Sequence, residues 1–268
     1  MQPQFQKMQQ MLGMMRKAIQ DYSMLSDGDR VLIGVSGGKD SVVLLTGLAL
    51  LREFIGIDYS LEAITLDPGF SGVRQDYSPI AALCETLSVP YRVRETDIGE
   101  IVFNIRKEPN PCSLCARMRR GALHDAARAL GCNKVALGHH ADDAAETFIM
   151  NLFNEGRVGC FSPVTYLSRK DLFVIRPLVL ARERDVIHAQ RVCALPVVKS
   201  LCPADHATTR EWTKGFLKSL ERESPGVIKR ILGAMQRGDV SDWGSPRPPV
   251  TREDFLSAAE DGQAPDKP

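Results

Sequence analysis

The residues with the clearest chemical potential are Ser-Gly-Gly-Lys-Asp-Ser at 36–41. An apolar, β-branched run at 31–35 precedes them and predicts a buried strand, and the apolar residues after them begin a helix. A strand, a glycine turn and a helix N-terminus direct bare N–H groups and the positive end of a helix dipole at one point. The glycines permit close approach of a phosphate, the lysine adds a charge and the serines add donors. We therefore expect a phosphate-binding loop made of Ser36, Gly37, Gly38, Lys39, Asp40 and Ser41.

Three of the seven cysteines have a setting that suits a metal. Cys112 and Cys115 form a Cys-x-x-Cys pair just before a predicted helix, and Cys202 lies far along the chain. Two thiolates from one turn and a distant third could bind one metal centre. A structural zinc remains open, with His206 as a fourth ligand, and so does a pair of unliganded thiols. The other cysteines are expected to be ordinary buried residues: Cys84, Cys132, Cys160 and Cys193.

Alternating strands and helices must position these residues. Because successive parallel strands connect by right-handed crossovers, the order predicts an α/β fold, a parallel twisted sheet with helices on both faces. The predicted strands span 31–35, 60–66, 91–95, 134–137, 173–175 and 195–198. The predicted helices span 1–24, 77–87, 122–130, 182–191, 212–220 and 227–235, with two more ending near Phe54 and Phe153.

Ligands of such sheets bind beyond the carboxyl ends of the strands. The loop at 36–41 should therefore lie beside the ends of the second and fourth strands. His140 and Asp143 are expected to be structural, as a backbone-bonded histidine and a charge at a helix N-terminus. Glu183 and Arg184 are expected to face solvent. Further nucleotide contacts are expected from the strand ends: Leu66, Asp67, Gly138 and His139.

The composition bounds the class of protein. The chain has 268 residues, of which 44% are hydrophobic and 25% are charged, as is ordinary for a globular protein. The formal net charge is +1, so nucleic-acid binding would require local clusters of basic residues. Seven cysteines is an odd number and argues against a disulfide framework. We expect no membrane span, no secretory signal and a cytoplasmic location.

Four segments are expected. An amphipathic, methionine-rich helix at 1–25 packs on the domain or contacts a dimer partner. A nucleotide-binding domain with the Cys-x-x-Cys insertion spans 26–200, and a helical segment carrying the third cysteine spans 201–240. Proline, glycine and acidic residues predict a disordered tail at 241–268.

The three motifs together resemble a known family. The stretches at 36–41, at 111–121 (Pro-Cys-Ser-Leu-Cys-Ala-Arg-Met-Arg-Arg-Gly) and at 137–143 (Leu-Gly-His-His-Ala-Asp-Asp) are similar to those of the tRNA 2-thiocytidine synthetase (TtcA-like) family. This family belongs to the PP-loop ATP pyrophosphatase superfamily. Ile-Arg-Pro-Leu at 175–178 also fits, and the resemblance spans roughly residues 12–238. Lysidine synthetases share the first and third motifs, whereas the Cys-x-x-Cys with two arginines is typical of the thiolating group.

The resemblance implies an enzyme for ATP- and iron–sulfur-dependent tRNA thiolation, with the fold of the PP-loop group. ATP would adenylate a base carbonyl oxygen with the help of Mg²⁺, and sulfide would displace AMP. The implied partners are tRNA, a sulfur donor (a cysteine desulfurase or sulfide) and a second copy of the chain in a homodimer. The chain departs from the family in a contracted segment at 66–70 and in a third-cysteine region, 199–202, that has only one cysteine.

The resemblance also assigns roles. The loop residues, with Lys39 and Asp40 as catalytic groups, would cradle the phosphates of ATP. Asp142 would orient Mg²⁺ or the activated base, and Arg119 or Arg120 would steady the developing negative charge. A 4Fe–4S cluster would be held by Cys112, Cys115 and Cys202.

Two other functions remain open. One is a lysidine-type C–N ligase that adenylates its substrate and has a structural zinc. The other is a nucleotide- or RNA-binding iron–sulfur protein without catalytic activity. Anaerobic purification separates these hypotheses, because a brown protein indicates a cluster and a colourless one with stoichiometric zinc indicates the ligase. RNA binding without ATP turnover would indicate the scaffold.

Replacing the third cysteine tests the ligand set. Cys202→Ser is expected to abolish the cluster while leaving ATP binding intact, because the serine hydroxyl is a poor substitute for a thiolate and the phosphate loop is separate in sequence. Visible absorption and ATP binding of the anaerobically purified variant measure the two effects. Retention of the brown colour in the variant would contradict the three-ligand assignment.

Overall fold

The computed structural model describes residues 3–107, 111–204, 209–248 and 253. Six strands form one sheet in the order β3-β2-β1-β4-β6-β5. The first five in this order pair in parallel, as predicted, and β5 pairs with β6 in the antiparallel sense. The strands are β1 (Asp29–Gly34), β2 (Tyr59–Asp67), β3 (Tyr91–Glu95), β4 (Lys134–Ala136), β5 (Val164–Leu167) and β6 (Leu172–Ile175).

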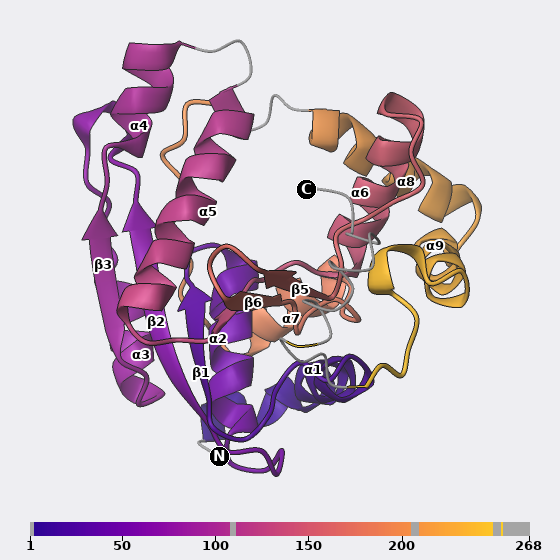
Figure 1. Cartoon of the computed structure of the whole chain (residues 1–268), viewed down its shortest axis with the longest axis horizontal. Coiled ribbons are helices and arrows are strands. Elements are labelled where there is room, and N and C mark those ends of the chain that lie inside the picture. Colours follow the sequence, from indigo (N-terminus) through magenta and orange to yellow (C-terminus); the bar gives the residue numbers. More distant parts are fainter. Residues whose placement is uncertain (1–2, 108–110, 205–208, 249–252, 254–268) are drawn as a thin grey trace.

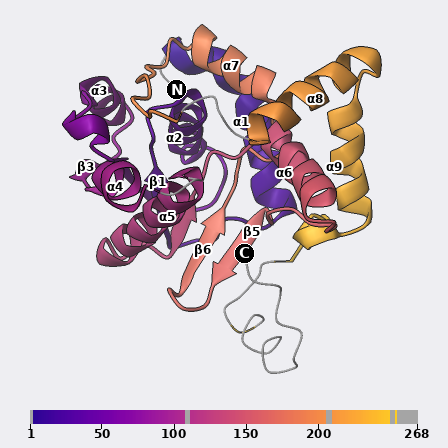
Figure 2. The ribbon, with the colours of Figure 1, turned by 90° about the horizontal axis from the view of Figure 1, so that it is seen from above.

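Helices cover both faces of the sheet (Figures 1 and 2). One face packs on α5, and the other packs on α1, α2, α3 and α7. Consecutive residues of β1 divide between them, because Val31 and Ile33 join the second layer and Leu32 joins the first. A strand buried on both faces needs a continuous apolar run, which is why 31–35 was recognisable in the sequence. The helices are α1 (Gln9–Asp21), α2 (Lys39–Leu51), α3 (Ser78–Thr86), α5 (Pro111–Ala129) and α7 (Glu183–Val192).

A second group of helices stands beside the sheet. Helix α6 (Ala141–Asn154) follows β4 and packs against α8 (Thr209–Glu223) and α9 (Val227–Arg237) around Ile149, Leu217 and Ile228. Figure 1 shows these three helices grouped at the right, across from α5 and the short α4 (Ile98–Glu100). The π-helical turn Ile101–Arg106 completes the segment that leads to α5. None of the helices in the described ranges is long and apolar enough to cross a membrane.

The methionine-rich N-terminal segment is part of the core. Met8, Met15 and Tyr22 are at most 1% exposed, and α1 packs against α2 and α7. The expectation that this helix packs on its own domain is confirmed. Its apolar stripe is therefore not a surface for a second copy of the chain, because the side chains that would make the contact are already covered.

Three local predictions differ from the structure. Helix α5 begins at Pro111, so Cys112 and Cys115 lie in its first turns and not before it; proline suits the start of a helix because it needs no N–H partner there. The stretch 195–198 is not a strand. Strand β5 was not predicted, since its four residues are too few to show a clear alternation.

The beginning of the predicted tail packs on the domain. Trp243 is fully buried, donates from Nε1 to the carbonyl of Phe161 (2.8 Å), and meets the ring of Tyr22 edge-on at 6.2 Å. The backbone N–H of Arg247 donates to the carbonyl of Asp21 (2.8 Å). Residues 241–248 are thus held by the end of α1 and are not disordered; one large aromatic side chain outweighs the polar composition around it. The rest of the predicted tail lies outside the described residues, apart from residue 253.

Trp243 is expected to be a major contributor to stability. Trp243→Ala should lower the free energy of unfolding by about 3–5 kcal/mol, because it opens a large cavity and removes a buried hydrogen bond. Urea denaturation followed by circular dichroism measures this change. Trp212→Ala is the matched control: that tryptophan is 59% exposed, and its loss should cost less than about 1 kcal/mol. Equal effects of the two substitutions would contradict the packing described for residues 241–248.

Candidate nucleotide and thiol site

The predicted phosphate loop lies between the carboxyl end of β1 and the start of α2. Gly37 has a φ of +84°, a conformation that favours glycine. Gly38 is the N-cap residue of α2 and has an extended backbone conformation. No side chain at this position accepts a hydrogen bond from the first N–H groups of the helix. Ser41 Oγ donates to the carbonyl of Gly38 (2.9 Å), and the Gly38 N–H donates to Ser36 Oγ (3.3 Å). The first N–H groups of α2 therefore remain available to an anion, as the sequence predicted.

Lys39 and Asp40 carry the charges of the loop. Lys39 Nζ lies 3.1 Å from Asp40 Oδ2 and 3.2 Å from Glu183 Oε1. Burial disfavours its charge, but the two carboxylates outweigh burial and raise the pKa of Lys39. Asp40 Oδ1 is buried and accepts no hydrogen bond in the described part of the chain, although His140 Nε2 lies 3.7 Å from it. Because a buried acceptor is normally satisfied, this oxygen is available to a cation or to a donor on a bound ligand.

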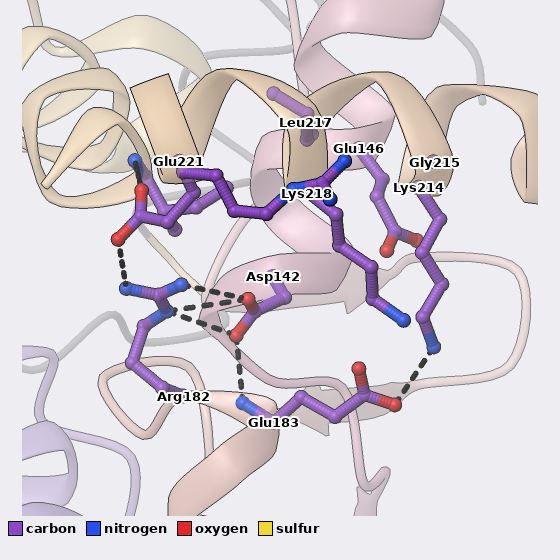
Figure 3. A pocket seen from close by; sticks show the side chains of 11 residues that line it. Asp142, Glu146, Arg182, Glu183, Lys214, Gly215, Leu217, Lys218 and Glu221 are labelled. Atoms are coloured by element: carbon purple, nitrogen blue, oxygen red, sulfur yellow. Dashed lines mark hydrogen bonds and ion pairs between the residues drawn. The ribbon is translucent and has the colours of Figure 1, made fainter. Parts of the chain in front are cut away.

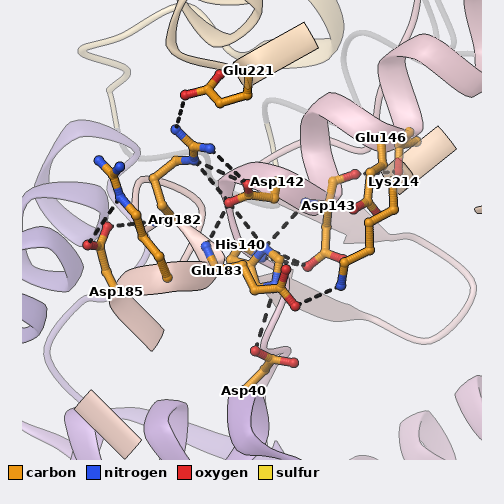
Figure 4. Close-up of polar contacts among 12 residues, drawn as sticks. Asp40, His140, Asp142, Asp143, Glu146, Arg182, Glu183, Asp185, Lys214 and Glu221 are labelled. Atoms are coloured by element: carbon orange, nitrogen blue, oxygen red, sulfur yellow. Dashed lines mark hydrogen bonds and ion pairs between the residues drawn. The ribbon is translucent and has the colours of Figure 1, made fainter. Parts of the chain in front are cut away.

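Glu183, at the start of α7, contacts cations of two other helices, Lys39 of α2 and Lys214 of α8; Figure 4 shows the second contact. Its carboxylate also accepts from Lys214 Nζ of α8 (2.7 Å). Burial works against the charge, yet Lys214 and Lys39 together lower the pKa of Glu183 to about 2. The expectation that Glu183 faces solvent is wrong, because cations from α2 and α8 converge on it. Arg184 is exposed as expected, with 77% of its side chain accessible.

Asp142 is held by the first residue of α7, Glu183, and by Arg182, which precedes that helix. The Asp142 carboxylate accepts from Nε and Nη2 of Arg182 (3.1 Å each at the closest oxygen) and from the backbone N–H of Glu183 (2.7 Å). Arg182 in turn contacts Glu221 of α8 at 3.4 Å. Asp142 therefore fixes the start of α7, and a metal ion or base would have to displace these donors to reach it.

The strand-end residues have mainly structural contacts. The Asp67 carboxylate accepts from the N–H groups of Gly69 (3.0 Å) and Gln75 (3.3 Å) and so holds the turn after β2. The Leu66 side chain is buried in the core cluster of the α5 face. A Cβ on Gly138 would lie 3.1 Å from the Asp40 carbonyl carbon, so glycine allows β4 to approach the start of α2 closely.

The two histidines make different contacts, and the nucleotide contact expected of His139 stays a prediction. His140 is the N-cap of α6: its N–H donates to Asp143 Oδ2 (2.9 Å), and its Nδ1 accepts from the Asp143 N–H (3.3 Å). The structural roles predicted for His140 and Asp143 are confirmed. The His139 ring packs on Phe161 at 5.0 Å, and burial together with nearby Arg176 lowers the pKa of His139 to about 3. His139 is thus a neutral side chain whose Nδ1 has no partner among the described residues.

A contact missed from the sequence joins the third cysteine to the phosphate loop. The N–H of Val198 donates to the carbonyl of Gly37 (2.9 Å), and the Val198 side chain lies 3.0 Å from the place of a Gly37 Cβ. Cys202 follows four residues later, within at most about 14 Å along the chain. The stretch 195–198 thus lies against the loop without forming a strand.

The Cys-x-x-Cys pair lies near Cys202. Burial raises the pKa of Cys115, Arg119 opposes the rise, and Cys202 and Cys112 add to it, so these groups are near enough for their charges to interact. Burial and Asp67 raise the pKa of Tyr77, and Arg119 opposes the rise; the Tyr77 ring lies 3.7 Å from the place of a Gly37 Cβ. Arg119 is therefore near both Cys115 and the Tyr77 ring beside the phosphate loop.

The thiols of Cys112, Cys115 and Cys202 are chemically suitable ligands for an iron–sulfur or zinc centre. All seven cysteines are free, and Cys112, Cys115 and Cys202 are partly exposed, whereas Cys84, Cys132 and Cys193 are buried as predicted. Cys160 was also predicted to be buried but is partly exposed, and its thiol donates to the carbonyl of Ala144 (3.4 Å). Over the described ranges, no three His, Cys, Asp or Glu side chains are already grouped as ligands of one ion. His206, the candidate fourth zinc ligand, lies outside those ranges.

A cavity of about 580 Å³ lies between α6, the start of α7 and α8 (Figure 3). Asp142, Arg182 and Glu183 form its floor, and α8 and α9 form the opposite wall. Glu146 on α6 also lines it; burial and the neighbouring Asp143 raise the pKa of Glu146 to about 7, although Arg210 and Lys214 oppose this.

The strand order and the loop after β1 define the class of protein. Residues 6–196 match the family model of the PP-loop domain. A tRNA-cytidine(32) 2-sulfurtransferase from Pelobacter propionicus is 39% identical over 236 residues, which are 87% of this chain and 86% of that protein. One from Shewanella loihica is 37% identical over 254 residues, 93% of this chain and 78% of that protein. The chain belongs to the tRNA-cytidine(32) 2-sulfurtransferase family of PP-loop proteins.

A solved structure agrees with this membership. The U34-tRNA thiolase NcsA from Methanococcus maripaludis, determined with its [4Fe-4S] cluster, is 28% identical with a TM-score of 0.72. The match covers 86% of this chain and 78% of that one. The predicted fold and the family resemblance are therefore confirmed.

Glu146 makes the stability of the site depend on pH. The folded chain keeps its proton up to about pH 7, whereas the unfolded chain loses it near 4.5, so stability falls as the pH rises between these values. Glu146→Gln removes this penalty. The free energy of unfolding of the variant minus that of the natural chain should therefore be about 1–2 kcal/mol larger at pH 8 than at pH 5, after solvent screening. Urea denaturation at both pH values measures the difference.

Glu155→Gln on the same helix is the control for this experiment, since 58% of that side chain is exposed. It should change stability by less than about 0.5 kcal/mol at either pH. A Glu146→Gln effect of the same size at both pH values would rule out a raised pKa at this position.

Proposed function

We propose that this chain is an ATP-dependent, iron–sulfur-dependent tRNA sulfurtransferase that replaces the C2 oxygen of a cytidine with sulfur. The names of the relatives indicate cytidine 32 of tRNA as the target. The observation that carries the proposal is the Val198–Gly37 hydrogen bond, which holds the segment before the third cysteine against the phosphate loop, so that Cys202 lies within about 14 Å of chain from the contact. Activation of a base and delivery of sulfur to it require these two groups in one region.

The phosphate loop binds the triphosphate of ATP. The N–H groups at the start of α2 and the ammonium of Lys39 meet the phosphates, and the free Asp40 oxygen is the best placed acceptor for a Mg²⁺ ion or its water. A carbonyl oxygen is a poor leaving group, and transfer of AMP to it makes it a good one. Arg119, near both Tyr77 and Cys115, lies where negative charge develops on the substrate.

Cys112, Cys115 and Cys202 would hold a 4Fe–4S cluster through their thiolates. When bound there, this group would supply the sulfur that displaces AMP from the activated base. The three thiols are partly exposed, so a sulfur donor could reach them. The sulfur comes from sulfide or a cysteine desulfurase, and the reaction takes place in the cytoplasm.

The proposal is tested by the nucleosides of tRNA. Mass spectrometry of tRNA from a strain lacking this protein should show the loss of 2-thiocytidine. A plasmid copy should restore it, and a copy with Cys115→Ala should not, because one ligand of the cluster is missing. Cys193→Ala is the matched control, since this cysteine is buried at the end of α7, away from the three ligands. If no thiolated nucleoside disappears, the proposed reaction is wrong.

A further inference from the structure

Helix α8 carries two rows of side chains on either side of Gly215, away from its buried residue Leu217. Residues four apart lie on one side of a helix. Cations occupy one row, and the aromatic pair Trp212 and Phe216 occupies another. Gly215 lies between the rows, and a Cβ there would meet nothing within 4 Å. The helix backbone is therefore open to close approach along this face. The cation row consists of Arg210, Lys214, Lys218 and Arg222.

The aromatic residues form an exposed cluster, the aromatic platform, made of Phe153, Trp212 and Phe216. The rings of Trp212 and Phe216 are stacked, with centroids 5.6 Å apart and an interplanar angle of 2°. Phe153 at the end of α6 lies 5.8 Å from Phe216. Trp212 is 59% exposed and Phe153 is 54% exposed. A tryptophan held flat by a neighbour but open on its other side is suited to stacking on a further ring.

The cation row connects this face to the nucleotide loop. Arg210 pairs with Asp143, and Lys214 pairs with Glu183, which also holds Lys39. Lys218 has no carboxylate partner in the described ranges, and its ammonium extends into the cavity of Figure 3. An unpaired cation beside paired ones is available to an anion that arrives with the substrate.

We infer that the aromatic platform and the cation row bind a single-stranded segment of the tRNA substrate, with a base stacked on Trp212 and backbone phosphates along Lys218 and Arg222. Stacking aromatics beside a line of cations are the two parts by which proteins hold single-stranded RNA. The net charge of +1 gives no general attraction to RNA, so binding depends on such a local row. This inference rests on the proposed function, because it assigns the place of that substrate.

The test uses the full-length, cluster-loaded protein and unmodified tRNA. Trp212→Ala should weaken tRNA binding roughly 5- to 150-fold, and Trp212→Phe should restore most of it, because any aromatic face can stack. In a plot of the logarithm of the tRNA affinity against the logarithm of the salt concentration, Lys218→Gln should reduce the magnitude of the slope by about 0.7–0.9. Fluorescence anisotropy at several salt concentrations measures both effects. Phe54→Ala is the matched control, since this exposed aromatic residue lies near the end of α2 and away from α8.

Two further measurements keep the outcomes distinct. ATP binding of each variant should equal that of the natural chain, which shows that the fold is intact. If the natural chain thiolates tRNA but Trp212→Ala and Lys218→Gln bind tRNA as Phe54→Ala does, the RNA face is wrong and the proposed function stands. If Trp212→Ala changes only the oligomeric state seen by light scattering, the platform is a protein contact and the inference is overturned. If the natural chain thiolates no tRNA, the proposed function fails, and tRNA binding alone then decides whether α8 is an RNA face.

Discussion

The carboxylate of Glu183 between two ammonium groups is the interaction on which the site depends. Lys39 comes from the start of α2 and Lys214 comes from α8, so one acidic residue fixes the phosphate loop to the C-terminal helices. Its lowered pKa shows that the cations more than compensate for burial. Since a partly buried carboxylate with two cationic partners stays ionised across the physiological range, α8 keeps its position beside the nucleotide region.

The same arrangement explains why Asp142 is an orienting group. It holds Arg182 and the first N–H of α7, and this places Glu183 between the lysines. Asp142 and Glu183 thus both contribute to the floor of the cavity. In the proposed function, the chemistry is left to the N–H groups at the start of α2, the Asp40 oxygen that accepts no hydrogen bond, and three thiols from different segments of the chain.

The parts of the fold and of the candidate site that depend on local sequence pattern could be predicted from the sequence. The strand at 31–35 and its glycine turn are a short-range signal, and the cysteine spacing indicates a metal centre without any knowledge of the fold. Glu183 could not be predicted, because its partners are about 144 residues before and 31 after it. Trp243 was missed for a similar reason: its burial depends on α1, at the other end of the chain.

The contact between Tyr22 and Trp243 has a consequence for synthesis of the protein. The hydroxyl of Tyr22 donates to the carbonyl of Trp243 across 221 residues of sequence. The chain is synthesised from its N-terminus, so the methionine-rich helix gains its contact with Trp243 only after more than two hundred further residues have been added. This long-range contact therefore forms late in the folding of the chain, after the local helix contacts.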